Sequence, residues 1–154
     1  MAVSSCQTEE IKRIIVNFAL ENQVKLPVDF QKKRVIVISG PTCCGKSSLA
    51  ITLAKILGGE IISADSMQVY RGMDIGTAKV TRQERMEVAH HLIDIREIYE
   101  SFNIVDFYFE ARTAIQQILQ RGNVPIVVGG SGFYLHALLY GPPSGPPSLP
   151  ELRQ

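Results

Sequence analysis

The sequence predicts an α/β fold built on a parallel sheet, from three observations. Short apolar stretches without polar alternation occur at residues 35–39 and 125–128, as in strands buried on both faces. Longer segments at 47–57 and 104–119 repeat apolar residues at helical spacing. Glycine-rich turns follow the strand candidates. Because strands alternate with helices, the strands should be parallel, joined by right-handed crossovers, with their carboxyl ends at one edge.

The first elements follow in order along the chain. Residues 35–39, Val-Ile-Val-Ile-Ser, are expected to form a central strand covered on both faces. A helix over 47–57 has one apolar face, and two glycines end it. A second strand over 60–64 ends before Asp65, and the apolar run 92–95 is a third candidate, after a long polar loop.

The later elements complete the pattern. Residues 104–119 predict a crossover helix, with Asn103 as its N-cap and Gly122 just past its end. A buried strand over 125–128 leads into a Gly-Gly-Ser-Gly turn and a helix that starts at Phe133. The chain is therefore divided into an N-terminal extension, a core and a proline- and glycine-rich exit segment, with bounds 1–34, 35–141 and 142–154.

Composition limits the class of protein. With 154 residues, 45% hydrophobic and 20% charged, the chain suits one globular domain. The formal net charge of +1 gives no broad basic surface for nucleic acid. Three cysteines form neither a disulfide framework nor a zinc pattern, and the apolar stretch 14–20 is too short to span a membrane. A cytoplasmic protein with no obligate protein partner is expected.

A phosphate-binding motif lies between the first strand and the first helix. The sequence Gly-Pro-Thr-Cys-Cys-Gly-Lys-Ser matches GxxxxGK[ST] in the context that this motif requires. Backbone amides and the helix N-terminus hold phosphate oxygens, Lys46 supplies a cation, and the Ser47 hydroxyl can ligate Mg²⁺. The fold is therefore expected to be P-loop NTPase-like, with three layers. The expected phosphate-binding residues are Gly40, Pro41, Thr42, Cys43, Cys44, Gly45, Lys46 and Ser47.

Two further residues should meet the motif at the same edge. Asp65 can serve as a general base or a metal ligand, or simply as a helix N-cap. Ser131 can donate a hydrogen bond to a leaving phosphate oxygen, or can be an ordinary turn serine. The segment Pro-Ile-Val-Val-Gly-Gly-Ser-Gly offers no Walker-B aspartate, which disfavours a hydrolysing NTPase.

Other polar residues leave alternatives open. His90 and His91 are adjacent and lack matching ligands, so a structural role is favoured over a metal site. Tyr70, Arg71 and Lys79 in the long loop can contact RNA by stacking and phosphate pairing. The same residues are equally compatible with an ordinary polar loop.

Four strings together resemble the tRNA dimethylallyltransferase (isopentenyltransferase) family, over residues 35–153. They are GPTCCGKSSLA, GGEIISADSMQVYRGMDIGTAK, HHLIDI and VPIVVGGSGFYLHALL. The resemblance implies transfer of a dimethylallyl group from dimethylallyl pyrophosphate to N6 of an adenosine beside the anticodon of tRNA. It also implies that the P-loop, which often carries a nucleotide- or ATP-binding label in this family, holds the pyrophosphate with Mg²⁺.

The resemblance assigns roles residue by residue. Asp65 matches the general base, and Ser131 stands where the family usually has a threonine near the leaving group. The residues implied to contact tRNA are Asp65, Ser66, Met67, Gln68, Ser131 and Arg153. The family continues beyond this sequence with a helical tRNA-binding insertion and further core residues, so we expect a fold incomplete at its C-terminus and impaired transfer by this chain alone.

Three alternatives differ in acceptor or in activity. A P-loop kinase for a small metabolite is compatible with the phosphate motif, but the segment Ser-Ala-Asp-Ser-Met-Gln disfavours it. An adenylate isopentenyltransferase would prenylate free adenine nucleotides. An inactive phosphate-binding fragment would bind pyrophosphate without transferring anything.

Overall fold

The computed structural model describes residues 35–143. The strands are β1 (Ile36–Ser39), β2 (Gly59–Ser63), β3 (His90–His91) and β4 (Val124–Gly129), and the helices are α2 (Lys46–Leu57), α3 (Arg82–Glu87), α4 (Ile104–Gln120) and α5 (Gly132–Tyr140). The predicted extension 1–34, most of the exit segment, and Arg153 lie outside the described residues.

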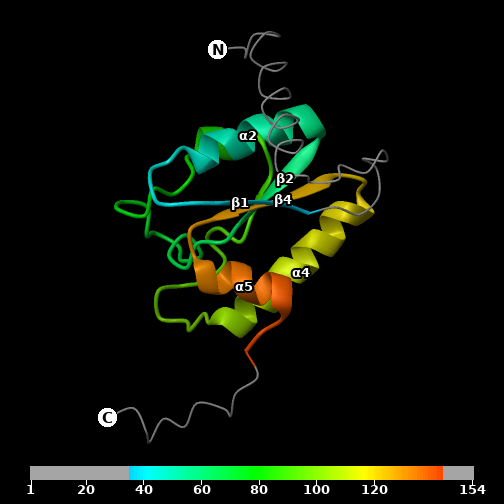
Figure 1. Cartoon of the computed structure of the whole chain (residues 1–154). Coiled ribbons are helices and arrows are strands. Elements are labelled where there is room, and N and C mark those ends of the chain that lie inside the picture. The colour runs from blue at the N-terminus through cyan, green and yellow to red at the C-terminus, as the bar shows by residue number, and fades with distance from the viewer. Residues whose placement is uncertain (1–34, 144–154) are drawn as a thin grey trace, which may run out of the picture. The chain divides into compact units, whose positions relative to one another are not determined.

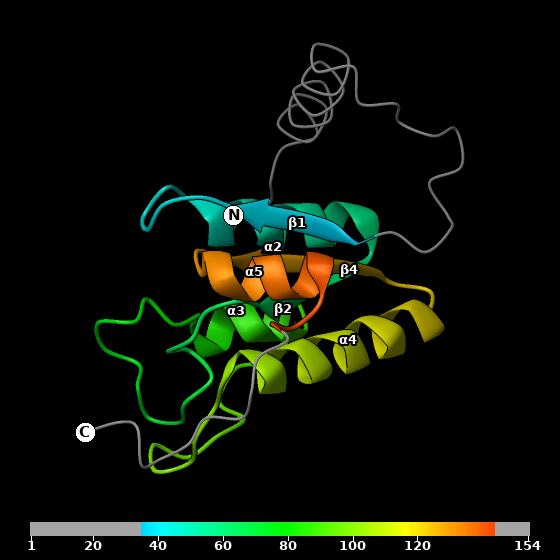
Figure 2. The same ribbon diagram turned by 60° about the horizontal axis from the view of Figure 1, so that its bottom comes forward.

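The strands form one parallel sheet, as the sequence predicts. Within the described residues their order is β1-β4-β2-β3, and every pairing is parallel. Helix α2 lies against one face, whereas α4 and α5 lie against the other (Figures 1 and 2). The carboxyl ends of the strands therefore meet at one edge, where open α/β sheets bind their ligands.

The main core lies between the sheet and the α4–α5 pair. Ile62 and Val127 point into it from neighbouring strands and are fully buried. The rings of Phe107 in α4 and Tyr134 in α5 stack with centroids 4.2 Å apart. Burying a large apolar side chain stabilises a fold by roughly 1.5–3 kcal/mol, so this cluster fixes α5, and with it the turn at the end of β4.

Strand β1 corrects one expectation. We expected residues 35–39 to form a central strand covered on both faces, but β1 is an edge strand of the described sheet, and Val37 is 37% exposed. Ile36 and Ile38 face the α2 side in register with β4. The apolar sequence of residues 35–39 indicates only that the strand favours burial. β-Branched residues alone do not specify whether a strand has one neighbouring strand or two.

Local capping explains where the helices begin and end. Helix α2 ends at Gly58, in the left-handed conformation that glycine adopts without steric cost. Asn103 caps α4 as predicted, forming a reciprocal capping box with Asp106. Helix α3 was not predicted, although Thr81 and Glu84 form the same kind of box. Its sequence signature, a threonine followed three residues later by a glutamate, was present within the presumed loop.

The predicted strand at 92–95 is wrong. The strand is His90–His91, and the chain then turns, because Leu92 and Asp94 adopt positive φ values of 62° and 55°. Leu92 and Ile93 are nevertheless buried. Their apolar character therefore reflects packing in a bend, which a short apolar run does not distinguish from a strand.

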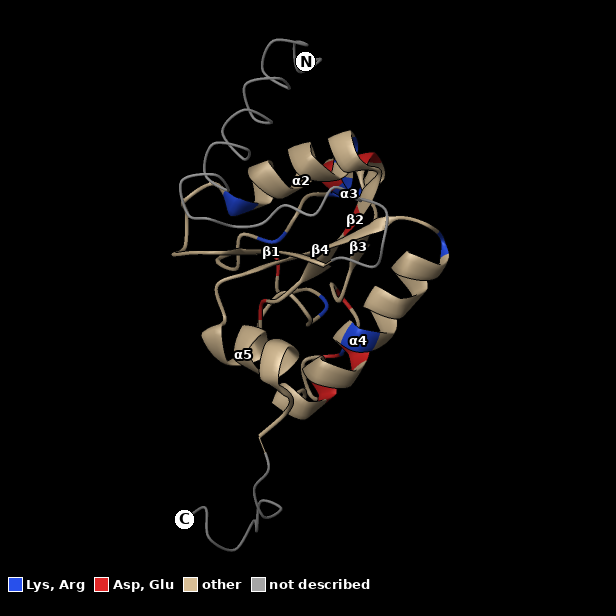
Figure 3. Ribbon diagram, turned by 45° about the vertical axis from the view of Figure 1, so that its right-hand side comes forward, with Lys and Arg blue, Asp and Glu red and all other residues tan. Residues whose placement is uncertain are grey.

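Charges are distributed unevenly over the helices. Helix α5 carries no charged residue, whereas α4 carries Asp106, Glu110 and Arg112 in its first half, and Arg121 follows its last residue (Figure 3). Phe133 and Tyr140 of α5 are 82% and 78% exposed. This helix therefore offers no cation to RNA phosphates, in keeping with the near-zero net charge.

Glu60 organises the amino end of the sheet, opposite the ligand edge. Its buried carboxylate accepts two hydrogen bonds from Arg121, at 3.0 and 2.8 Å, and one from Asn123 at 2.8 Å. His91 Nε2 lies 2.6 Å from the same carboxylate. The hydrogen bond from Arg121 is the largest influence on its pKa, which falls from 4.5 to about 2. The cluster thus ties β2 to β3 and to the end of α4.

Glu60→Gln should lower the free energy of unfolding at neutral pH by about 1–3 kcal/mol, because charged hydrogen bonds in a buried site are lost. The folded-state pKa of Glu60 lies below its unfolded value, so its stabilisation is complete above about pH 4.5 and is lost as the pH falls towards 2. Urea unfolding of both proteins from pH 7 to pH 3 measures this. A stability difference that does not shrink at acid pH would contradict the assignment.

Candidate phosphate and acceptor site

A pocket lies at the carboxyl ends of the strands, on the α2 side of the sheet. The phosphate motif forms one wall, and the polar loop after β2 forms another. Of the predicted site residues, the pocket is lined by Thr42, Cys43, Lys46, Ser47, Asp65 and Gln68. The fold therefore brings the predicted phosphate-binding and acceptor-binding segments into one cavity.

The phosphate loop turns sharply before α2. Cys43 and Gly45 adopt positive φ values of 64° and 86°, and Gly45 is the N-cap of α2. Residues of this conformation turn successive amide groups towards one side, which is how such loops surround an anion. The ammonium of Lys46 donates a hydrogen bond to the carbonyl of Pro41, within the same loop.

A close approach between strands sets the floor of the pocket. A Cβ atom added to Gly129 would lie 2.1 Å from the carbonyl oxygen of Ala64. Only glycine fits there, since no side chain tolerates such a contact. Gly129, the first glycine after the last predicted strand, is thus required by packing between β4 and the end of β2.

Asp65 lies two residues after the end of β2 and lines the pocket. Its Oδ1 accepts hydrogen bonds from the backbone amides of Met67, at 2.8 Å, and Gln68, at 3.4 Å. This is the capping geometry that the sequence left as an alternative. In the described residues Oδ2 has no such partner, so capping and a role in the pocket are compatible.

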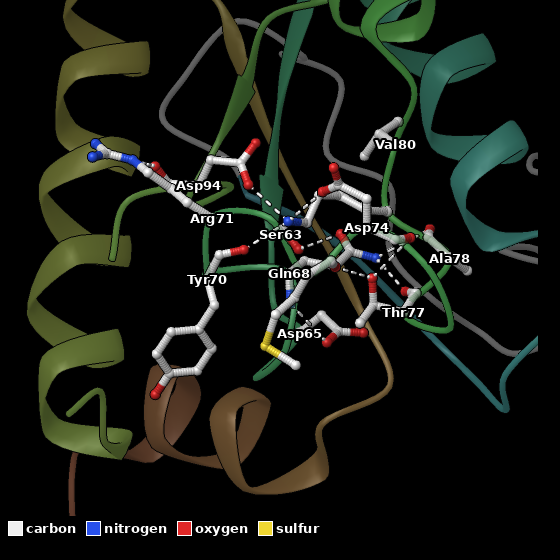
Figure 4. Close-up of polar contacts among 12 residues, drawn as sticks. Ser63, Asp65, Gln68, Tyr70, Arg71, Asp74, Thr77, Ala78, Val80 and Asp94 are labelled. Atoms are coloured by element: carbon white, nitrogen blue, oxygen red, sulfur yellow. Dashed lines mark hydrogen bonds and ion pairs between the residues drawn. The ribbon is translucent and has the colours of Figure 1, made fainter. Parts of the chain in front are cut away.

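Gln68 joins the two arms of the polar loop. Its Oε1 accepts a hydrogen bond from the Ser63 hydroxyl at 3.1 Å, and its Nε2 donates to the carbonyls of Thr77 and Ala78, both at 3.3 Å (Figure 4). These bonds use both ends of the carboxamide. Its orientation at the pocket wall is therefore fixed by the beginning and by the end of the loop.

The RNA-contact hypothesis for Lys79 is wrong, because its side chain is only 1% exposed. It forms ion pairs with Asp74 and Asp94, at 2.8 and 2.7 Å. Burial, the largest single influence, lowers its pKa, but the bonds to Asp74 and Asp94 outweigh burial and raise it overall. Arg71 is exposed but is paired with Glu97 at 2.7 Å. The polar composition of the loop thus partly reflects internal ion pairs.

The remaining candidates occupy different places. Ser131 is the N-cap residue of α5 without a side-chain cap bond, and it does not line the described pocket, although Gly130 beside it does. His91 belongs to the Glu60 cluster, as the structural interpretation of the pair suggested. His90 instead lines the pocket, because parallel pairing places it beside Ile61 on the α2 face. The register that places it there is not visible in the sequence.

The described residues contain no group of three or more His, Cys, Asp or Glu side chains arranged to hold a metal ion. A hydroxyl such as that of Ser47 still suits Mg²⁺, which keeps several water ligands and takes others from phosphate oxygens. Within residues 35–143, none of the helices has the length and apolar character needed to cross a membrane.

The match to known proteins decides the family. The family model described as IPP transferase matches residues 68–154, which is more than half of the chain. The chain belongs to the IPP transferase family. A solved member of the family, the tRNA isopentenylpyrophosphate transferase of Bacillus halodurans, is 50% identical with a TM-score of 0.70, over 74% of this chain and 38% of that one.

Three further similar proteins are all named dimethylallyltransferases. A tRNA dimethylallyltransferase of Protochlamydia amoebophila is 73% identical over 97% of this chain and 44% of its own length. One from Chlamydia pneumoniae is 57% identical over 84% of this chain and 38% of its own length. A eukaryotic dimethylallyltransferase solved acting on tRNA is 45% identical, with a TM-score of 0.67, over 70% of this chain and 27% of that one. This family member therefore spans less than half the length of these relatives, and its P-loop NTPase-like fold is theirs.

Lys46→Ala should weaken binding of Mg²⁺-pyrophosphate by at least about 10- to 100-fold, because a charge-assisted hydrogen bond to phosphate is lost. The free energy of unfolding should change by less than about 0.5 kcal/mol, since Lys46 is not one of the buried core residues and its hydrogen bonds stay within its own loop. Calorimetric titration checks this. Lys55→Ala is the matched control, because it removes a surface ion pair with Glu87; equal affinities in both variants would refute the assignment.

Alkylation of Cys43 should slow when Mg²⁺-pyrophosphate binds. Cys43 and Cys44 are both exposed, but of the two only Cys43 lines the pocket. Mass spectrometry after pulses of a small alkylating agent measures each thiol separately, with Cys6, outside the motif, as reference. Rates at Cys43 that do not respond to the ligand would place the pyrophosphate elsewhere.

Proposed function

We propose that this chain is the phosphate- and adenosine-binding part of a tRNA dimethylallyltransferase. The enzyme would transfer a dimethylallyl group from dimethylallyl pyrophosphate to N6 of an adenosine beside the anticodon. One observation carries the proposal: a member of the IPP transferase family has Lys46 and Ser47 in the same pocket as Asp65 and Gln68. A tRNA acceptor would place the protein in the cytoplasm.

The P-loop wall would bind the leaving group. As the bond between carbon and the pyrophosphate oxygen breaks, negative charge builds up on that oxygen. The Lys46 ammonium and the backbone amides before α2 are preorganised donors that would stabilise this charge. A bound Mg²⁺, held by the Ser47 hydroxyl and by phosphate oxygens, would neutralise part of the pyrophosphate charge. The closely spaced glycines at the end of β4 would leave room for the pyrophosphate.

The opposite wall would hold the acceptor. The N6 lone pair forms the new carbon–nitrogen bond, and one N6 proton passes to the Asp65 carboxylate. The amides of Met67 and Gln68 orient this carboxylate through Oδ1, which leaves Oδ2 for the proton. Ser66, Met67 and the Gln68 carboxamide would then recognise the base. Because the reacting adenosine must leave its stack, such a wall needs a fixed shape.

The remaining residue assignments are also proposals. Ser131, at the start of α5, would donate to a leaving oxygen only if the ligand extends beyond Gly130. Arg153 would contact the tRNA backbone. Neither placement is needed for the chemistry at Asp65 and Lys46.

The function is tested by transfer from radiolabelled dimethylallyl pyrophosphate to an anticodon stem-loop RNA. The protein in its full length is assayed beside the Protochlamydia relative as a positive control. Asp65→Asn should keep pyrophosphate affinity and lower the single-turnover rate by about 100-fold or more, because general-base catalysis typically contributes that much. Unchanged turnover in Asp65→Asn would remove the base role.

The acceptor distinguishes the alternatives. Label incorporated into AMP but not into the stem-loop would indicate an adenylate isopentenyltransferase, and phosphoryl transfer from ATP to a metabolite would indicate a kinase. Pyrophosphate binding without transfer, while the positive control is active, would indicate an inactive phosphate-binding chain. Each of these outcomes would overturn the proposed function.

A further inference from the structure

Lys79 is a buried cation in an otherwise polar loop. Its ammonium donates to the carbonyl of Tyr70 at 2.6 Å, to Asp94 Oδ1 at 2.7 Å and to Asp74 Oδ1 at 2.8 Å. An ammonium group has three N–H donors. Each donor of Lys79 therefore has an acceptor at hydrogen-bond distance, which is what a buried charge requires.

The acceptors come from three separate segments of the chain. Tyr70 lies near the start of the loop, Asp74 near its middle, and Asp94 after β3 (Figure 4). Asp94 also pairs with Arg85 of α3 at 2.6 Å. One ammonium thus holds the loop together and joins it to the framework beside β3.

The residues on either side of Lys79 face the pocket. Ala78 and Val80 line it, whereas Lys79 between them points into the ion-pair network. The carbonyls of Thr77 and Ala78, immediately before Lys79, are the acceptors that hold the Gln68 carboxamide. The position of Lys79 therefore determines where these two carbonyls lie, and with them the Gln68 carboxamide that they bind.

The backbone around this network is strained. Ala78 and Asp94 adopt positive φ values of 48° and 55°, an uncommon conformation for residues other than glycine. Such conformations persist when surrounding contacts overdetermine them, and they cluster at functional sites. The bonds of Lys79 and Arg85 to Asp94 are contacts of this kind.

We propose that Lys79 is a positioning residue for the acceptor wall: through Tyr70, Asp74 and Asp94 it fixes the loop 65–80 so that Gln68 and Asp65 face the P-loop. Lys79 itself does not touch the substrate. Only the kinetic consequence rests on the proposed transfer reaction. The ordering of the loop does not depend on it.

The first test is amide hydrogen exchange in Lys79→Met, which keeps most of the side-chain volume and removes the charge. Exchange of amides in residues 66–80 should accelerate by at least about tenfold. Removing one partner of a buried ion pair leaves the other charge without compensation, which strongly destabilises the folded conformation. Lys55→Met is the matched control: it breaks the 2.6 Å ion pair between Lys55 of α2, whose side chain is 46% exposed, and Glu87 of α3. It should leave exchange in 66–80 unchanged.

The second test is the kinetics of the protein in its full length, well below its unfolding temperature. Lys79→Met should reduce kcat/KM for the stem-loop by about 10- to 100-fold, because small misplacements of reacting groups have effects of this size. The affinity for Mg²⁺-pyrophosphate should stay within about twofold. A merely structural lysine would instead lower both in proportion to the unfolded fraction.

Asp94→Asn serves if Lys79→Met does not fold, since it keeps an oxygen acceptor and weakens the pair. It should give the same pattern in smaller measure. Unchanged exchange in 66–80 would overturn the proposal. So would equal losses of kcat/KM for the stem-loop and of affinity for Mg²⁺-pyrophosphate. A different result is possible: exchange in 66–80 accelerates in the variant, and the wild-type protein transfers nothing to RNA. Accelerated exchange in the variant supports the role of Lys79, whereas absent transfer by the wild-type protein refutes the proposed function.

Discussion

The pocket depends on how closely two parallel strands approach at their carboxyl ends. Gly129, the last residue of β4, lies against the backbone of Ala64, the residue that follows β2. A side chain at this point would separate the two strand ends. The turn that leads to α5 and the loop that begins with Asp65 would then move apart, so the absence of a single Cβ atom shapes the site.

The two edges of the sheet use charge in opposite ways. At the amino edge, Glu60 is surrounded by Arg121, Asn123 and His91, and all of these groups serve the fold. At the carboxyl edge, the bonds of the P-loop lysine to described residues stay within its own loop, and the side chain lines the pocket. A buried and fully paired charge stabilises one conformation, whereas a partly exposed cation retains the capacity to bind an anion.

Sequence patterns predicted the fold and the P-loop well because both depend on neighbouring residues. The helix caps at Asn103 and Gly58, the motif from Gly40 to Ser47, and the alternation of strands with helices all follow from local chemistry. The errors arose where position in space decides. The edge location of β1 depends on how many strands surround it, and the bend at residues 92–95 depends on side chains far away in the sequence.

The acceptor wall could not have been predicted in the same way, for a reason that distinguishes it from the P-loop. A P-loop binds through consecutive backbone amides, so its sequence carries nearly all of its geometry. The wall formed by Asp65 and Gln68 also depends on contacts between residues further apart in the sequence, such as Gln68 with Thr77, 9 positions on, and Lys79 with Asp94, 15 positions on. In the sequence Lys79 has the same appearance as a surface lysine, and only its burial reveals that it works inside the loop. A site that binds a phosphate can be specified by neighbouring residues in the sequence. A site that holds a flipped base in a rigid surface needs bonds between residues further apart. A polar loop of this length has no hydrophobic core of its own to order it.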